Sequence, residues 1–281
     1  MYAMAYNKSL LQRFGAPLPR QIMSWDELTQ YCCTIKPLLP AGVYPMVDLG
    51  GNQVNLVSYY MGQKQAWIYK DERTYSTPEA FKGWLDLWVN FRREGLIPDA
   101  ETTASFPETD VSNSILVAGR AVLGSIWSNQ LGGYQAAMTD ELDLILLPGA
   151  QDKGLTINPS RFLTVNKKSS NREAALRFVN FFVNNLEAGS VLGADRGTPS
   201  SQAVRDHIKP NATPTEQKIY DFYTIATQYT VAREKNLPYD NEFLDTFRLY
   251  YEQSAYNQIT TTQAAQNIYD LVQRLIARSK Q

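Results

Sequence analysis

The sequence contains few of the residues that most often bind metals or act as nucleophiles. Its two cysteines, Cys32 and Cys33, are neighbours in a helix-like segment, and His207 is its one histidine. Zinc requires about four ligands, and adjacent residues on a helix point in different directions. We therefore expect no metal site and no cofactor. We interpret the cysteines as packing residues, with a vicinal disulfide as the alternative. Histidine-based catalysis is not expected, because a lone histidine is typical of an ordinary surface or half-buried position.

Excess charge and long apolar runs are also lacking. The 27 basic and 28 acidic residues leave a net charge of −1, so no basic field attracts nucleic acid or an anionic membrane. No apolar run has the length of a transmembrane helix. The first residues show neither the basic nor the apolar region of a signal peptide. We expect neither nucleic-acid binding nor direct membrane insertion by this chain.

Aromatic residues are abundant, with 17 tyrosines and 5 tryptophans. Tyrosine and tryptophan combine a flat apolar face with a polar edge, which suits amphipathic ligands such as sugars. The length of 281 residues allows one or two domains with sizeable cores. Composition therefore favours a globular chain that handles a small amphipathic molecule.

The most informative stretch covers residues 106–128. It predicts a helix over 111–118 that ends at Gly119, a buried strand over 121–127, and a new helix capped by Ser128. Trp127 would then lie at the carboxyl end of a strand beside a helix start, where open α/β sheets bind small ligands. The alternative is that Trp127 is a core residue.

Further strands and helices are predicted on both sides of this stretch. Strands are expected over 1–6, 42–47, 142–147 and 161–165, and Pro45 favours an edge position for the second. Capped or periodic helices are expected over 24–36, 77–95, 171–183, 215–229, 241–253 and 262–279. The aromatic stripe of the helix over 77–95 is interpreted as core. Strands interleaved with helices indicate the α/β class, with a helical C-terminal half.

Several blocks, taken in order, resemble a known family. They are Tyr6-Asn7-Lys8-Ser9-Leu10-Leu11 with the helix from Ser24, Gly119-Arg120-Ala121-Val122-Leu123, Leu146-Leu147-Pro148-Gly149, Lys167-Lys168-Ser169-Ser170-Asn171, and Gly197-Thr198-Pro199. Each block is a turn with a capped helix and is unspecific by itself. Together they resemble the extracellular solute-binding proteins of ABC importers, family 1, sugar-binding type.

The resemblance implies a two-lobe, type II periplasmic-binding-protein-like fold. Residues 1–148 would form the second lobe, 149–235 the returning part of the first, and 236–281 closing helices packed on the second. In the family, the block at Tyr6 follows the first half of lobe one. We therefore expect that a signal peptide, a lipid-attachment cysteine and half of lobe one precede this sequence, so that the chain is truncated and its first lobe incomplete. Phe162, Phe178, Phe181 and Phe182 would then be partly exposed, and the chain would bind sugar more weakly than one extended upstream.

The resemblance also implies a function without catalysis. The chain would bind a sugar or oligosaccharide between its lobes outside the cytoplasmic membrane and deliver it to the permease of an ABC importer. Trp127 would stack on the sugar, with Trp67 as a weaker candidate. Hydroxyl groups of the ligand would bond to residues of both lobes and the closing segment: Asp48, Asn129, Arg161, Arg196 and Tyr239. Ordinary ion pairing is the alternative for the two arginines.

Two other functions stay open. A carbohydrate-active enzyme of the glycoside hydrolase kind would need two carboxylates across one cleft, and Asp48 alone stands near the end of a predicted strand. A helical interaction scaffold would explain the C-terminal half, but the buried strands over 121–126 and 142–147 argue against it.

Overall fold

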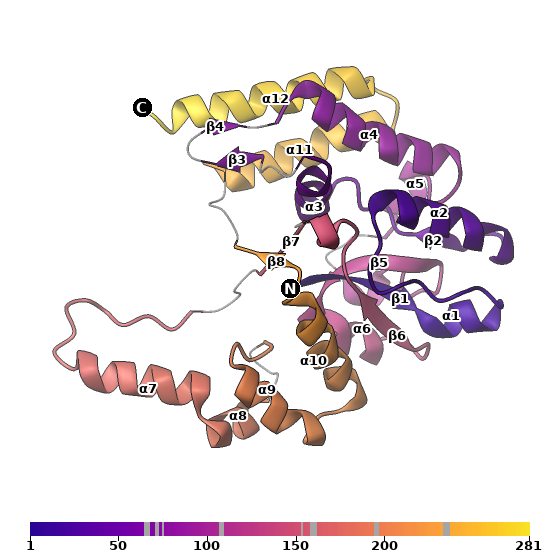
Figure 1. Ribbon diagram of the computed structural model, residues 1–281. Coiled ribbons are helices and arrows are strands. Elements are labelled where there is room, and N and C mark those ends of the chain that lie inside the picture. The colour runs from indigo at the N-terminus through magenta and orange to yellow at the C-terminus, as the bar shows by residue number, and fades with distance from the viewer. Residues whose placement is uncertain are drawn as a thin grey trace.

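In the part of the chain that the structure describes, a four-stranded mixed sheet forms the centre of the body (Figure 1). Its strands run in the order β2 (Tyr44–Met46), β5 (Ala121–Trp127), β1 (Tyr2–Asn7) and β6 (Leu142–Ile145). β1 is antiparallel to both of its neighbours, whereas β2 is parallel to β5. The predicted strands over 1–6, 42–47 and 142–147 are confirmed, and so is the edge position expected from Pro45.

This computed structural model describes residues 1–64, 68–70, 73–74, 76–106, 110–152, 154–157, 162–193, 197–232 and 237–281, with the backbone alone at 60–64 and 70. Shorter elements join the sheet to its covering layers. They are α1 (Lys8–Arg13), η1 (Lys36–Leu38), α3 (Gln53–Lys64), β3 (Tyr69–Lys70), β4 (Arg73–Thr74), α5 (Ala100–Ala104), η2 (Val111–Asn113), η3 (Ser128–Gln130), η4 (Ala150–Asp152) and η5 (Lys209–Asn211).

Helices α2 (Trp25–Ile35), α4 (Pro78–Arg93), α11 (Asp240–Ala255) and α12 (Thr261–Arg278) contribute to a large core together with one face of the sheet. Trp84 and Trp88 of α4 are fully buried there. Their rings meet edge to face with centroids 5.2 Å apart, a geometry that aromatic rings favour. The predicted aromatic stripe is therefore confirmed as core. The capping box predicted at Ser24 starts α2, and α12 begins with a further capping box at Thr260.

Helices α6 (Leu131–Ala136) and α10 (Pro214–Ala226) pack on a second core at the opposite side of the sheet. Ile219 and Phe222 of α10 are buried in it. Lys218 Nζ also donates to Glu141 Oε1 at 2.6 Å and to the Leu142 carbonyl at 2.7 Å. Part of the segment 149–235 therefore returns to the sheet of residues 1–148. The division into lobes at these boundaries stays a prediction.

Helix α7 (Arg172–Asn184) stands away from the body (Figure 1). Helix α8 (Leu186–Leu192) packs on α9 (Gln202–Ile208), and α9 packs on α10 through a small core of Val204, Ile208 and Tyr220. The strand β7 (Leu155–Thr156), before α7 in the chain, pairs in parallel with β8 (Thr230–Val231), after α10. All of α7 is described, and none of its residues is buried. Phe162, Phe178 and Phe181 are 73%, 58% and 49% exposed, as expected, whereas Phe182 is half-buried.

Two predicted elements are wrong, and a third differs in its N-cap. Residues 111–118 form a 3-10 turn and further turns instead of a helix, because the Asp110 and Ser114 side chains accept from the Ser112 and Leu116 amides. The described part of the expected strand over 161–165 belongs to no strand, and its side chains are mostly exposed. The helix expected after Trp127 is present as the 3-10 turn η3 followed directly by α6, but its N-cap is Trp127 rather than Ser128.

The exposed face of α7 predicts self-association, because contiguous exposed apolar surface drives protein contacts. Replacing Phe178 and Phe181 together by lysine should reduce the concentration-dependent increase in sedimentation coefficient. The free energy of unfolding should change by no more than about 0.5 kcal/mol per site, since both side chains are exposed.

The matched control is Leu249→Lys on α11, where a leucine is 49% exposed at a distance from α7 in the sequence. This control should sediment as the unchanged chain does. Equal self-association of the unchanged chain and the double variant would show that α7 is not the contact surface.

Candidate functional site

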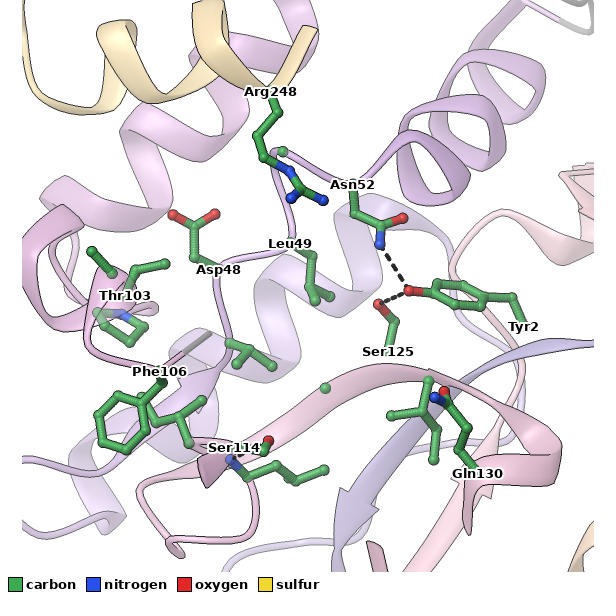
Figure 2. A pocket seen from close by; sticks show the side chains of 18 of the residues that line it. Tyr2, Asp48, Leu49, Asn52, Thr103, Phe106, Ser114, Ser125, Gln130 and Arg248 are labelled. Atoms are coloured by element: carbon green, nitrogen blue, oxygen red, sulfur yellow. Dashed lines mark hydrogen bonds between the residues drawn. The ribbon is translucent and has the colours of Figure 1, made fainter. Parts of the chain in front are cut away.

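A pocket of about 570 Å³ lies between the C-terminal half of β5 and the loop that follows β2 (Figure 2). One wall is the turn 48–52 between β2 and α3, and a second is the outer part of α11 with Arg248 and Glu252. The loop after α5 adds Phe106, and β5 adds Ser125 and Trp127. Pockets of this size suit small molecules and commonly combine apolar walls with a few placed polar groups.

Hydrogen-bonded neutral side chains line one side of the pocket. Asn52 Nδ2 donates to the Tyr2 hydroxyl at 2.8 Å, and the Ser125 hydroxyl lies 3.5 Å from the same oxygen (Figure 2). Asn55, fully buried behind them, donates from Nδ2 to Ser125 Oγ at 2.9 Å. Asn52 Oδ1 accepts from the Val54 amide at 2.9 Å, so the same residue caps α3. The start of α3 therefore holds these groups at fixed positions.

A buried charged cluster of Asp48, Arg92 and Tyr251 lies where the turn 48–52 meets α11, and we refer to it as the Asp48 cluster. Arg92 Nη2 forms an ion pair with Asp48 Oδ2, and the Tyr251 hydroxyl donates to Asp48 Oδ1. Arg92 Nη2 also lies 3.0 Å from the Tyr251 hydroxyl oxygen, which accepts from it. Burial, followed by the charge of Asp48, raises the pKa of Tyr251 well above its usual value, so its hydroxyl stays a donor.

Two glycines allow the Tyr251 ring to approach the turn. A Cβ at Gly50 would overlap the ring, and one at Gly51 would lie 3.3 Å from its Cδ1. The Gly50 amide donates to Asp48 Oδ1 at 3.0 Å, and its carbonyl accepts from Trp84 Nε1 at 2.8 Å. The Gly-Gly sequence is thus required because α11 presses an aromatic ring on the backbone.

Aromatic faces complete the pocket. Trp127 is half-buried and meets the Tyr2 ring edge to face, with centroids 4.8 Å apart at 71°. Its amide donates to Gln130 Oε1 at 3.0 Å, which fixes the chain where β5 becomes η3. Phe106 also lines the pocket, with the Arg120 guanidinium 5.5 Å from its ring centroid.

The predicted site residues are only partly brought together. Trp127 and Asp48 both line the pocket, but the Asp48 carboxylate is taken up by the cluster. Among the described residues, Asn129 and Tyr239 lie outside the pocket walls. Tyr239 is the N-cap of α11, with φ 58°, and its ring centroid lies 3.6 Å from Arg278 Cζ. Trp67, Arg161 and Arg196 lie outside the described residues, and their roles stay predictions.

Other residues of the pocket were not singled out from the sequence. Asn52 had a detectable signal, because an asparagine after two glycines and before an apolar helix is a typical N-cap. Arg248 had none, since it is an exposed residue of a helix nearly 200 residues further on. Figure 2 shows its guanidinium extending from α11 toward the turn 48–52.

The described residues contain no group of three or more His, Cys, Asp and Glu side chains placed to hold a metal ion. A search of the same residues finds no helix with the length and apolarity needed to cross a membrane.

Comparison with known proteins gives a family match over most of the chain. A family model described as "Bacterial extracellular solute-binding protein" matches residues 1–216. Among solved structures, a family 1 extracellular solute-binding protein from Alicyclobacillus acidocaldarius is 24% identical with a TM-score of 0.86. That match covers 98% of this chain and 69% of the other.

Two further solved structures share the fold and are described with carbohydrate ligands. An oligogalacturonide-binding protein from Yersinia enterocolitica, in complex with digalacturonic acid, is 20% identical with a TM-score of 0.78. The match covers all of this chain and 72% of that protein. An ABC substrate-binding protein from Listeria monocytogenes, in complex with cycloalternan, is 17% identical with a TM-score of 0.68, and the match covers 98% of this chain and 69% of that one. At these identities the likeness establishes the fold.

The packing of Tyr251 on Gly50 predicts that Gly50→Ala is destabilising. A methyl group there must displace a buried ring, and overpacking of this kind costs about 1–3 kcal/mol. Urea unfolding followed by fluorescence should show the loss.

Gly133→Ala is the matched control, because Gly133 lies exposed in α6 with no atom within 4 Å of an added Cβ. It should be neutral or stabilising by up to about 1 kcal/mol. Equal unfolding midpoints for the two variants would contradict the packing described for Gly50.

Proposed function

Because this chain belongs to the family of bacterial extracellular solute-binding proteins, we propose that it binds a sugar or oligosaccharide for uptake by an ABC importer. The proposal combines the family with the pocket at the end of β5. It places the chain outside the cytoplasmic membrane and makes the permease of the importer its protein partner. The chain would carry the solute without changing it chemically.

The single observation that carries the sugar assignment is the composition of the pocket walls. An aromatic face at Trp127 lies beside neutral hydroxyl and amide groups of Tyr2, Asn52 and Ser125. A sugar presents an apolar face of C–H groups and a rim of hydroxyl groups, so it can stack on the first and hydrogen-bond to the second. Fixed side chains of this kind lose little entropy when the ligand binds.

The wall contacts can be compared with the free energy of binding that a ligand requires. A dissociation constant of about 1 μM corresponds to about −8.2 kcal/mol. Each good hydrogen bond contributes about 0.5–1.5 kcal/mol, and bonds to a charged group such as Arg248 about 1.5–3 kcal/mol. One stacked ring and several such contacts contribute toward this free energy, against the cost of immobilising the ligand.

Ligands of the structural neighbours support the same class. Digalacturonic acid and cycloalternan are both oligosaccharides, and the proteins that hold them share the fold of this chain. We propose the family's mechanism, in which two lobes close over the solute. We propose that, when the lobes close, the ligand is also contacted by three residues from the facing segments: Arg161, Arg196 and Tyr239.

Catalysis is the weaker alternative. A glycoside hydrolase needs two carboxylates that flank the scissile bond. Of the described carboxylates, Asp48 and Glu252 line the pocket, and Asp48 accepts from Gly50, Arg92 and Tyr251. A carboxylate held by three donors is poorly placed to attack or protonate a sugar. Solute capture therefore accounts for this pocket better than hydrolysis does.

A thermal-shift screen against maltotriose, cellotriose, digalacturonic acid and cycloalternan tests the function. A sugar at a hundred times its dissociation constant should stabilise the chain by about 2.7 kcal/mol. Chromatography of the sugar after incubation should show no cleavage. Trp127→Ala should raise the dissociation constant of the binding sugar about tenfold, which corresponds to 1.4 kcal/mol.

Tyr31→Ala is the control for Trp127→Ala, since Tyr31 is an aromatic residue of α2 outside the pocket walls. Its dissociation constant should match that of the unchanged chain. Unaltered affinity in Trp127→Ala would remove the tryptophan from the site, and released products would replace capture by hydrolysis.

The neighbours Asn129 and Gln130 form a second matched pair. Both are exposed residues of η3, but only Gln130 lines the pocket and accepts from the Trp127 amide. Gln130→Ala should weaken sugar binding several-fold, and Asn129→Ala should weaken it less. The opposite order in a calorimetric titration would favour the sequence-based assignment of Asn129.

A further inference from the structure

The Asp48 cluster joins three segments that are far apart in the sequence. Asp48 follows β2, Arg92 lies in the last turn of α4, and Tyr251 lies 203 residues beyond Asp48, in α11. The Asp48 side chain is 3% exposed and that of Arg92 14%. Two charges held this far from water must satisfy each other, and removal of one partner leaves the other uncompensated. The cluster therefore holds the three segments in one arrangement.

Two walls of the pocket meet at this cluster. The turn 48–52 contributes Asp48, Gly51 and Asn52 to the pocket, and α11 contributes Arg248 and Tyr251. The Tyr251 hydroxyl donates to Asp48 and accepts from Arg92, so it is committed to the cluster and not to a ligand. Its ring is seated on Gly50, whose amide donates to the same carboxylate.

We propose that Tyr251 is a positioning residue for solute binding, which acts through Asp48 on the turn that carries Asn52. Asp48 then serves as the anchor of a pocket wall, in place of the ligand-binding role expected from the sequence. Arg92 neutralises Asp48 and joins α4 to the same anchor. The inference rests on the proposed function only for its effect on affinity, because the geometry of the turn can be measured without a ligand.

The affinity test is a double-mutant cycle of Tyr251→Phe and Asp48→Asn, titrated calorimetrically with the tightest-binding sugar of the panel above. Tyr251→Phe keeps the ring and removes one hydroxyl. Each single variant should raise the dissociation constant about tenfold, and the double variant no more than either single one, because both act on the same turn. A dissociation constant raised about a hundredfold in the double variant would overturn the proposal, because the two effects would then be independent. An unchanged dissociation constant in Tyr251→Phe would overturn it as well.

Phe243→Leu separates positioning from general stability. Phe243 is a fully buried residue of the same helix that does not line the pocket, and its substitution should lower the melting temperature. The dissociation constant should stay within about twofold of the unchanged value, because the Asp48 cluster is intact. An equal loss of affinity in Phe243→Leu would reduce Tyr251 to a stabilising role.

Amide hydrogen exchange tests the same idea without a ligand. In Tyr251→Phe, the amides of residues 50–54 should exchange at least about fivefold faster, because local opening of the turn becomes easier. In Phe243→Leu these amides should show no selective change relative to the rest of the molecule. Unchanged exchange at 50–54 in Tyr251→Phe would overturn the proposal. If no sugar of the panel binds the unchanged chain, the proposed function fails, and the exchange rates alone decide the role of Tyr251.

Discussion

The pairing of β1 with β5 is the constraint on which the rest of the body depends. β1 lies between β5 and β6, and every one of its six residues is buried. Its register places Tyr2 opposite Trp127 and Tyr6 opposite Leu123, across about 120 residues of sequence. Because side chains alternate along a strand, a shift of one residue would exchange the two faces of the sheet. The same register places the Tyr2 hydroxyl and the Trp127 ring at one pocket.

Charge and neutral polarity have separate roles around that pocket. The buried charges of Asp48 and Arg92 hold together segments that are far apart in the sequence. Neutral groups of Asn52, Ser125 and Tyr2 form the surface beside the aromatic face. A charge paired inside the wall is costly to disturb, whereas a neutral hydroxyl or amide can exchange water for a sugar hydroxyl at little cost. This division suits a protein that binds and releases an uncharged part of its ligand.

The covering of apolar surface differs between the body and the outlying helices. Both faces of the sheet are packed, one by the core to which α2, α4 and α12 contribute and the other by the core of α6 and α10. In contrast, α7 carries phenylalanine and leucine on several sides and buries none of them. An amphipathic helix usually covers its apolar face by packing on another element. The body therefore has a complete core of its own, while α7 presents a surface suited to contact with other protein.

The sequence by itself determined the local elements, the α/β class and the family resemblance. Several local features depend only on residues a few positions apart, so their effects can be predicted along the chain. They are the capping boxes at Ser24 and Thr260, the proline at the start of α4 and the left-handed conformation of Gly119. The aromatic stripe of α4 was read as core from its helical spacing. The position of Trp127 at a strand end was also predicted, and this was the part of the pocket that local pattern could indicate.

Tertiary structure alone decided what Asp48 does and which residues surround the pocket. Asp48 was assigned to a ligand from its place after a strand, but α4 and α11 bring Arg92 and Tyr251 to its carboxylate. Arg248 joins the pocket for the same reason, because α11 packs beside the turn 48–52. These outcomes depend on contacts between residues up to 203 positions apart, and one sequence contains no local signal for such contacts. Helix spacing and caps are set by neighbouring residues, whereas a pocket is set by the packing of whole elements against one another.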